Sequence, residues 1–188
     1  MIFTATPLPG AYVIEPRKIE DDRGFFARIL CQNEFLGQDL RLHLLQTNMA
    51  RTCRRGTIRG MHFQEPPHAE IKIVRCTKGA IYDVIVDLRP DSPEFKRWFG
   101  IELTQDNFKA LYVPEGFAHG YLTLADDSEI YYHTSEFYHP ESATGVRYND
   151  PEFGISWPIE IAVISRQDAE WPNFTARRVL IGSDKEME

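Results

Sequence analysis

An all-β domain is the fold class that the sequence predicts, and three observations support it. Short stretches rich in β-branched and aromatic residues recur from residue 44 onward. Turn residues separate them, as in Lys78-Gly79 and Pro114-Glu115-Gly116. The chain shows no long amphipathic helical pattern between them. Many short strands at this spacing are typical of a sandwich or barrel, and a cupin-type jelly-roll barrel is favoured because its interior forms a pocket.

The first 40 residues predict an extended N-terminal arm. Ala11 to Ile14 is a β-type stretch, and three prolines surround it. Prolines at this spacing favour an edge strand or an arm over a central strand. A charged turn over residues 21–24 follows. Residues 33–37 predict one short helical turn, capped by Asn33 and stopped by Gly37.

The middle of the chain predicts the barrel, and the end predicts an irregular tail. After Tyr138 the strand pattern gives way to prolines and tryptophans, yet the segment is too apolar to be disordered. We expect it to pack along the barrel and residues 182–188 to fray. The candidate strands are residues 44–48, 57–64, 71–76, 80–88, 98–103, 110–113, 121–124 and 130–134.

Length and composition indicate one soluble globular domain over residues 1–188. The hydrophobic fraction is 43% and the mean hydropathy −0.37. There is no apolar run of about 18 residues for a membrane span, and the N-terminus lacks a secretory pattern. Three cysteines without CxxC spacing predict reduced thiols, and hence a cytoplasmic protein. A net charge of −7 and a pI near 5.4 argue against nucleic-acid binding.

One histidine and one lysine on neighbouring predicted strands carry the candidate chemistry. His62 can take a proton near neutral pH, and Lys72 can stabilise developing negative charge. Guanidinium groups nearby are suited to holding a phosphate. Together these residues predict proton abstraction from a phosphate-bearing substrate. The arginines are Arg51, Arg54, Arg55 and Arg59. They could instead form a solvated basic edge that binds no ligand.

The spacing around His62 does not predict a metal centre in the barrel. Such a site needs two histidines that alternate on one strand, with a carboxylate nearby. Gln64 occupies the position two residues after His62, and His68 follows Pro66-Pro67 in a predicted loop. The histidines are too scattered along the chain to suggest a ligand set, so we expect no metal.

Strand parity makes two further predictions about the pocket. Lys72 shares a face with Val74 and Cys76, so it must meet an anion if it is buried. Arg59 and His62 differ by three positions, so a regular strand would point them to opposite faces. Both can line one cavity if Gly60 allows a bulge or the strand ends there.

Other candidate residues have a structural alternative. His119 lies between small residues that leave room for a ligand, and Asp168 is a late carboxylate that could orient a histidine base. Tyr132 and Tyr138 belong to an aromatic group whose simplest role is packing. A tyrosine can also donate a proton or stack on a nucleobase.

Several of these segments occur together, in the same order, in one known family. The segments Arg59 to Gln64, Pro114 to Gly120, Asp87 to Arg89 with Ser92-Pro93, and Asn149 to Pro151 resemble the dTDP-4-dehydrorhamnose 3,5-epimerase family. The resemblance runs from about Ile14 to Pro172. It implies a cupin-type homodimer, without metal or other cofactor, that acts on a nucleotide-diphosphate-linked 4-keto-6-deoxy sugar.

The resemblance also implies a role for each site residue. The position of His62 belongs to the base that removes the proton beside the ketone, and that of Asp168 to the carboxylate that orients it. Lys72 matches a lysine that stabilises the enolate, and Tyr132 a tyrosine that returns a proton to the opposite face. The positions implied to hold the substrate are Arg23, Phe26, Gln46, Asn48, Arg59, His119 and Tyr138.

The chain departs from the family pattern near the expected nucleotide. Arg28 and Ala143 stand where the family usually has glutamate, and Gln167 and His133 where it often has lysine. A change from carboxylate to guanidinium reverses the local charge and the hydrogen-bond capacity. Our hypothesis is that the nucleotide or the sugar differs from dTDP-4-keto-6-deoxyglucose.

Two alternatives to a 3,5-epimerase stay open at this point. One is a mono-epimerase or ketoisomerase of the same fold, because sequence does not reveal which carbons invert. The other is a cupin module that binds a sugar nucleotide without catalysis. The joint presence of His62, Lys72, Tyr132 and Asp168 argues against the second alternative.

Overall fold

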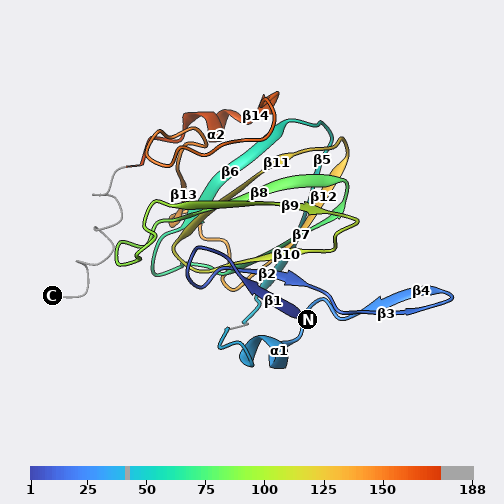
Figure 1. Cartoon of the computed structure of the whole chain (residues 1–188). Coiled ribbons are helices and arrows are strands. Elements are labelled where there is room, and N and C mark those ends of the chain that lie inside the picture. The colour runs from blue at the N-terminus through green and yellow to red at the C-terminus, as the bar shows by residue number, and fades with distance from the viewer. Residues whose placement is uncertain (41–42, 175–188) are drawn as a thin grey trace.

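Two facing sheets form a jelly-roll barrel in the computed structural model, which describes residues 1–40 and 43–174 (Figure 1). The first sheet has the order β1 (Ile2–Ala5), β2 (Tyr12–Glu15), β10 (Ala110–Val113), β7 (Lys72–Lys78), β12 (Ser128–Thr134) and β5 (Gln46–Thr52). The second has β13 (Ala143–Gly145), β6 (Thr57–Gln64), β11 (Phe117–Thr123), β8 (Ala80–Asp87) and β9 (Trp98–Thr104), and β14 (Val163–Ile164) pairs in parallel with β6. The predicted all-β fold is confirmed.

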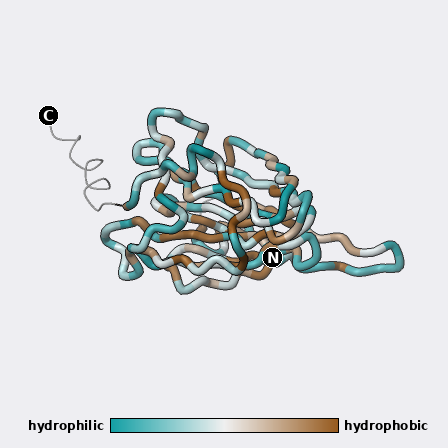
Figure 2. The backbone as a smooth tube through the Cα atoms, turned by 90° about the horizontal axis from the view of Figure 1, so that it is seen from above, coloured by the Kyte–Doolittle hydropathy of each residue, from teal (hydrophilic) through white to brown (hydrophobic). Residues whose placement is uncertain are grey.

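Burial explains why these segments are strands. β8 reads as a nearly continuous apolar run because it is covered on both faces. Ile81 and Ile85 point into the core between the sheets, while Val84 and Val86 face a second apolar layer. Figure 2 shows the hydrophobic stretches concentrated in the strands of the barrel, with hydrophilic residues in the outer loops.

The irregular tail forms that second layer. Val146, Phe153 and Phe174 are buried against Met61 and the outer residues of β8. The expectation that the tail packs along the barrel is therefore confirmed for residues up to 174. The predicted fraying of residues 182–188 lies outside the described residues.

The N-terminal region differs from the prediction at two points. β2 is paired on both sides, with β1 and β10, so the edge-strand prediction for residues 11–14 is wrong. β1 takes the edge position instead. The next residues form a separate hairpin, β3 (Lys18–Asp21) and β4 (Gly24–Ala27), that extends away from the barrel in Figure 1.

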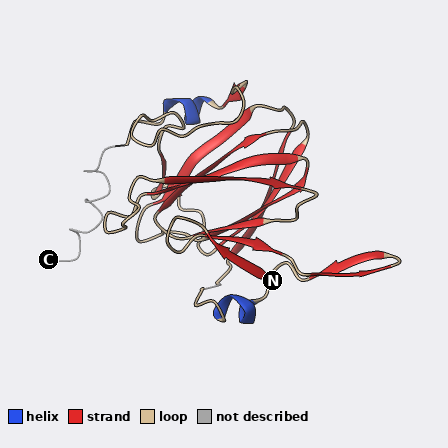
Figure 3. Cartoon of the chain, in the orientation of Figure 1, coloured by secondary structure: helices blue, strands red, loops and turns tan. Residues whose placement is uncertain are grey.

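Two short helices occur in the described residues, on different sides of the barrel (Figure 3). α1 (Gln32–Leu36) ends at Gly37, as predicted, but its N-cap is Cys31 and no side chain caps it. The assignment of Asn33 as the cap is therefore wrong. α2 (Arg166–Glu170) was not predicted, and neither it nor α1 has the length and hydropathy needed to span a bilayer.

Candidate active site

A cleft between the two sheets contains the predicted catalytic residues. One cavity of about 570 Å³ is lined by His62, Lys72, Tyr132 and Asp168. A neighbouring cavity of about 450 Å³ shares the first three of these residues, and Gln167 lines both. We refer to the two cavities together as the cleft. His62 enters it from β6 of one sheet, whereas Lys72 and Tyr132 enter from β7 and β12 of the other.

His62 and Asp168 form a hydrogen-bonded pair in the cleft. Nε2 of His62 lies 2.6 Å from Oδ1 of Asp168. The Asp168 side chain is 5% exposed, while that of His62 is 44% exposed and so accessible to a ligand. Burial raises the pKa of the Asp168 carboxyl, but the hydrogen bond and charge of His62 act against burial, and the net pKa is lowered. Asp168 is therefore an ionised acceptor that orients the imidazole.

The tail brings Asp168 to this position. β14 pairs in parallel with the start of β6, with Val163 opposite Thr57 and Ile164 opposite Ile58. Helix α2 follows directly, and the Ser165 side chain caps it by accepting a hydrogen bond from the backbone N–H of Asp168 at 3.0 Å. The short strand thus fixes the helix against the edge of β6 where His62 lies.

A bulge at Gly60 places Arg59 and His62 on the same side of β6. His62 is opposite His119 and Arg59 is opposite Tyr121, so three steps on β6 match two on β11. Gly60 has φ +136°, and a Cβ there would come within 2.5 Å of the Gly120 Cα. Only glycine fits this backbone and this close approach. Of the two possibilities that the sequence left open, a bulge or a strand end at Gly60, the structure has the bulge, and Arg59 and His62 both line the cleft.

Lys72 meets an anion from its own chain. Its ammonium forms an ion pair with Glu70, and both side chains are almost buried. Burial lowers the pKa of Lys72, and the charge and hydrogen bond of Glu70 oppose that change without cancelling it. Glu70 also lines the cleft. Glu70 was not among the predicted residues, although its spacing of two from Lys72 places both on one face of an extended segment.

A second histidine–aspartate pair lies beside the first. His119, opposite His62 across the two strands, has Nε2 2.8 Å from Oδ1 of Asp83 on β8. The Asp83 side chain is fully buried, and its second oxygen has no hydrogen-bond partner among the described residues. Asp83 was not among the predicted residues, and the signal for it was a carboxylate in the middle of the apolar run of residues 80–88. The strand predicted over residues 121–124 left His119 outside it, but β11 already begins at Phe117.

Tyr132 stands across the cleft from His62. Burial, and after it the charge of Glu70, raises the pKa of Tyr132. Its phenol therefore keeps its proton at neutral pH and can donate it. Around it, the cleft includes the other predicted ligand residues of the barrel, which are Gln46, Asn48 and Tyr138.

The remaining predicted residues lie elsewhere in the single chain. Arg23 pairs with Asp21 at 2.6 Å near the tip of the β3–β4 hairpin, and Phe26 is on the same hairpin. Neither lines the cleft. Of the four clustered arginines, Arg59 lines the cleft, whereas Arg51 pairs with Asp127 at 2.6 Å on the surface. The grouping of all four as one phosphate site is not supported.

Some of the positions that depart from the family pattern line the cleft, and others lie elsewhere. Ala143 and Gln167 line the cleft. Arg28 instead forms an ion pair with Glu34 at 3.3 Å beside a third cavity, whose lining includes Phe26 of the hairpin. Two of the departures are thus placed to touch a ligand in the cleft.

Comparison with known proteins shows the family of the chain. Residues 5–176 match the sequence model of the dTDP-4-dehydrorhamnose 3,5-epimerase family. The chain belongs to this family. A curated dTDP-4-dehydrorhamnose 3,5-epimerase from Methanothermobacter thermautotrophicus is 40% identical over 173 residues, which cover 90% of this chain and 92% of the relative. The prediction of an enzyme of the isomerase class is confirmed.

Solved structures of the epimerase family share the fold. The dTDP-4-dehydrorhamnose 3,5-epimerase from Bacillus anthracis, with TDP and PPi bound, has a TM-score of 0.89 and 40% identity over 92% of this chain and 99% of its own. A 3'-monoepimerase from Streptomyces bikiniensis, in complex with dTDP-quinovose, has a TM-score of 0.82 and 32% identity over 89% and 85%. The cupin-type jelly roll predicted from the sequence is therefore confirmed.

Proposed function

We propose that the protein is a cofactor-independent epimerase of a nucleotide-linked 4-keto-6-deoxy sugar, and that it inverts C3 and C5. The observation that carries this proposal is the His62–Asp168 pair, which faces Lys72 and Tyr132 in one cleft. These groups supply what inversion beside a ketone requires: a base, a cation for the enolate and an acid on the other face.

His62 is the base in this mechanism. Asp168 is ionised and can only accept, so the Nε2 of His62 carries the hydrogen that it donates. The lone pair is then on Nδ1, and this atom takes the proton from the carbon beside the ketone. The resulting imidazolium is stabilised by the adjacent carboxylate, as in other histidine–aspartate pairs.

Lys72 stabilises the charge that proton removal creates. A proton α to a ketone is acidic because its conjugate base is an enolate, whose oxygen needs a positive neighbour. The almost buried ammonium of Lys72 supplies that charge in surroundings where it acts strongly. Glu70 keeps the lysine protonated by opposing the effect of burial.

Tyr132 completes the inversion. It lines the same cavity as His62 but comes from the opposite sheet, so a sugar bound between them presents one face to each. Transfer of the phenolic proton to the enolate carbon from the Tyr132 side reverses the configuration. The proton removed by His62 and the proton given by Tyr132 balance, and both groups then re-equilibrate with water.

The hairpin supports a homodimer. Ile19 and Phe26 are each 68% exposed on β3 and β4, an unusual position for apolar side chains in a single chain. In a pair of chains, the hairpin of one protomer would cover these residues and bring Arg23 and Phe26 to the cleft of its partner. Light scattering tests this proposal: twice the chain mass of 21.8 kDa supports it, and the single-chain mass contradicts it.

The reaction is tested by offering the enzyme dTDP-4-keto-6-deoxyglucose in D2O and following label by NMR. Deuterium entering at C3 and C5 supports the proposal, and no deuterium at any carbon contradicts it. A mono-epimerase is the second candidate, because one structural relative is a 3'-monoepimerase. Label and inversion at a single carbon would identify it, and migration of the ketone would identify a ketoisomerase.

The nucleotide is the point at which we expect a difference from the relatives. Ala143 and Gln167 line the cleft where the family usually offers a glutamate and often a lysine. Calorimetric titration with dTDP, CDP, GDP and UDP tests this hypothesis. A clear preference for dTDP would contradict it. Free thiols at Cys31, Cys53 and Cys76 support a cytoplasmic location, which fractionation of the source cells would test.

A further inference from the structure

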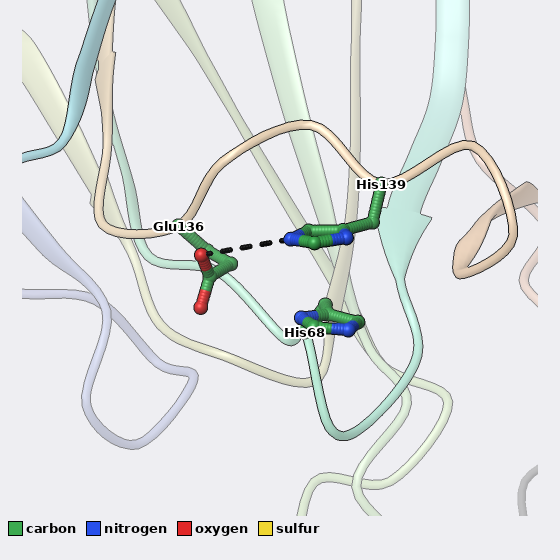
Figure 4. A group of neighbouring side chains, drawn as sticks. All are labelled: His68, Glu136 and His139. Atoms are coloured by element: carbon green, nitrogen blue, oxygen red, sulfur yellow. Dashed lines mark ion pairs between the residues drawn. The ribbon is translucent and has the colours of Figure 1, made fainter.

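A cluster of two histidines and one glutamate lies outside the catalytic groups, on the loops next to the cleft. Figure 4 shows His68, Glu136 and His139, with one nitrogen of each imidazole turned toward the carboxylate. One potential ligand atom from each residue lies within 4.8 Å of the others. All three side chains are partly exposed, so an ion can reach them from solvent.

The orientation of His139 is that of a metal ligand. Its Nδ1 lies 3.1 Å from Oε1 of Glu141, and its Nε2 lies 4.0 Å from Oε1 of Glu136. A metal-bound histidine usually donates the N–H of its other ring nitrogen to a carboxylate. Glu141 takes this position at Nδ1 of His139, so the lone pair of Nε2 is free to bind an ion. The distance from Nε2 of His139 to Oε1 of Glu136 is too long for a hydrogen bond. An ion between these two atoms, about 2.0–2.2 Å from each, would fit after the two side chains move slightly closer together.

His68 supplies the second imidazole. Its ring is stacked on that of His139, with centroids 3.5 Å apart and planes within 10°. The lone pair of an imidazole nitrogen lies in the plane of the ring, so both rings must turn well out of the stack to share one ion. The broad χ2 minimum of histidine permits this rotation.

One buried side chain holds the two loops in place. Gln64, 4% exposed at the end of β6, donates hydrogen bonds from Nε2 to the carbonyls of His68 and Phe137, both at 3.0 Å. Its Oε1 accepts from the backbone N–H of His139 at 2.7 Å. The backbones that carry the two imidazoles are thus tied to the same amide, so the two loops are held together before any ion binds, and only the side chains must move.

We propose that His68, Glu136 and His139 form a binding site for a divalent cation of the zinc class, with water completing the coordination. Two imidazoles and one carboxylate suit Zn²⁺, Co²⁺ or Ni²⁺, whereas Mg²⁺ and Ca²⁺ prefer oxygen ligands. The site is separate from the proton-transfer groups. Its bound ion would join the loop that leads to Lys72 with the loop that carries Tyr138.

Titration calorimetry with ZnCl₂ tests the site directly. The protein is prepared without a histidine tag and with the two accessible cysteines, Cys31 and Cys53, replaced by serine, so that neither a tag nor a thiolate competes. We expect one Zn²⁺ per chain, and no uptake of Mg²⁺. His68→Gln and His139→Gln should abolish binding, and Glu141→Gln should weaken it at least about tenfold.

The matched control is His43→Gln, which removes an exposed histidine outside the cluster and should leave binding unchanged. Circular dichroism confirms that each variant is folded. A second readout is the visible spectrum of the Co²⁺ form, which should change in intensity when His139 is replaced. Absence of Zn²⁺ uptake by the parent protein overturns the proposal, and so does equal uptake by His139→Gln and His43→Gln.

Discussion

His62 and Asp168 are 106 residues apart in the chain, yet Nε2 of the histidine lies 2.6 Å from Oδ1 of the aspartate. The contact depends on the pairing of β14 with β6. This pairing holds α2, which directly follows β14, where the carboxylate of Asp168 can reach His62. The proposed catalytic base is thus supported by the segment of the chain with the least regular sequence pattern.

Replacing the carboxylate by an amide should disable the base. Asp168→Asn keeps the size of the side chain but no longer compels His62 to donate from Nε2. We expect kcat to fall by about 10²- to 10⁴-fold, with a much smaller change in KM. Glu170→Gln, on the exposed side of the same helix, is the control and should keep full activity. An unchanged kcat for Asp168→Asn would remove the aspartate from the mechanism.

Glu70 should set the alkaline limit of activity. Burial lowers the pKa of Lys72 and Glu70 opposes this effect. Activity requires the protonated lysine, so it is lost as the pH rises through the pKa of Lys72. In Glu70→Gln the opposing charge is gone and that pKa falls further, which moves the alkaline limb of the kcat profile to lower pH. If the activity of Glu70→Gln declines at the same alkaline pH as that of the parent enzyme, Glu70 does not act on Lys72.

Tyr132→Phe should separate proton removal from inversion. The phenyl ring fills the same space in the cleft but has no proton to donate. His62 can still form the enolate and return a solvent-derived proton to the original face. We therefore expect deuterium incorporation into recovered substrate, with little or no inverted product. Normal formation of the inverted sugar would assign the acid role to another group.

Gly60→Ala should damage both stability and the site. The alanine would adopt an unfavourable backbone at φ +136°, and its Cβ would meet the Gly120 backbone. We expect a loss of about 1–3 kcal/mol from the backbone strain alone. Chemical denaturation measures it, with Gly24→Ala as the comparison, since Gly24 also has positive φ but nothing within 4 Å of its Cβ. Equal loss in both variants would show that the contact with Gly120 is unimportant.

The barrel could be predicted from the sequence because the alternation of apolar and polar residues, and the turn residues between the strands, are local signals. Six of the eight predicted strands match an observed strand to within two residues at each end. The strand predicted over residues 44–48 shares only Gln46 to Asn48 with β5, and the one predicted over residues 121–124 was started too late because Phe117 to Gly120 resemble the preceding turn. Helix α2 was not predicted, because five residues are too few to show the hydrophobic periodicity of a helix. The edge position predicted for residues 11–14 was wrong because β1, which follows no clear pattern, takes that place.

The site was predicted in part, for physical reasons that differ between residues. Lys72 required an anion on charge grounds, but sequence did not show that the anion was Glu70. The bulge at Gly60 could be anticipated from the spacing of Arg59 and His62. The pairing of His119 with Asp83 depends on the register between β8 and β11, and no local pattern reports that register.

The most direct test of the account is the fate of the carbon-bound hydrogen when His62 is changed to asparagine. Parent enzyme and variant are each incubated with the 4-keto nucleotide sugar in D2O, and deuterium beside the ketone is followed by NMR over time. We predict rapid incorporation with the parent enzyme and none above the enzyme-free rate with His62→Asn. Incorporation by the variant at the parent rate would contradict the assignment of His62 as the base.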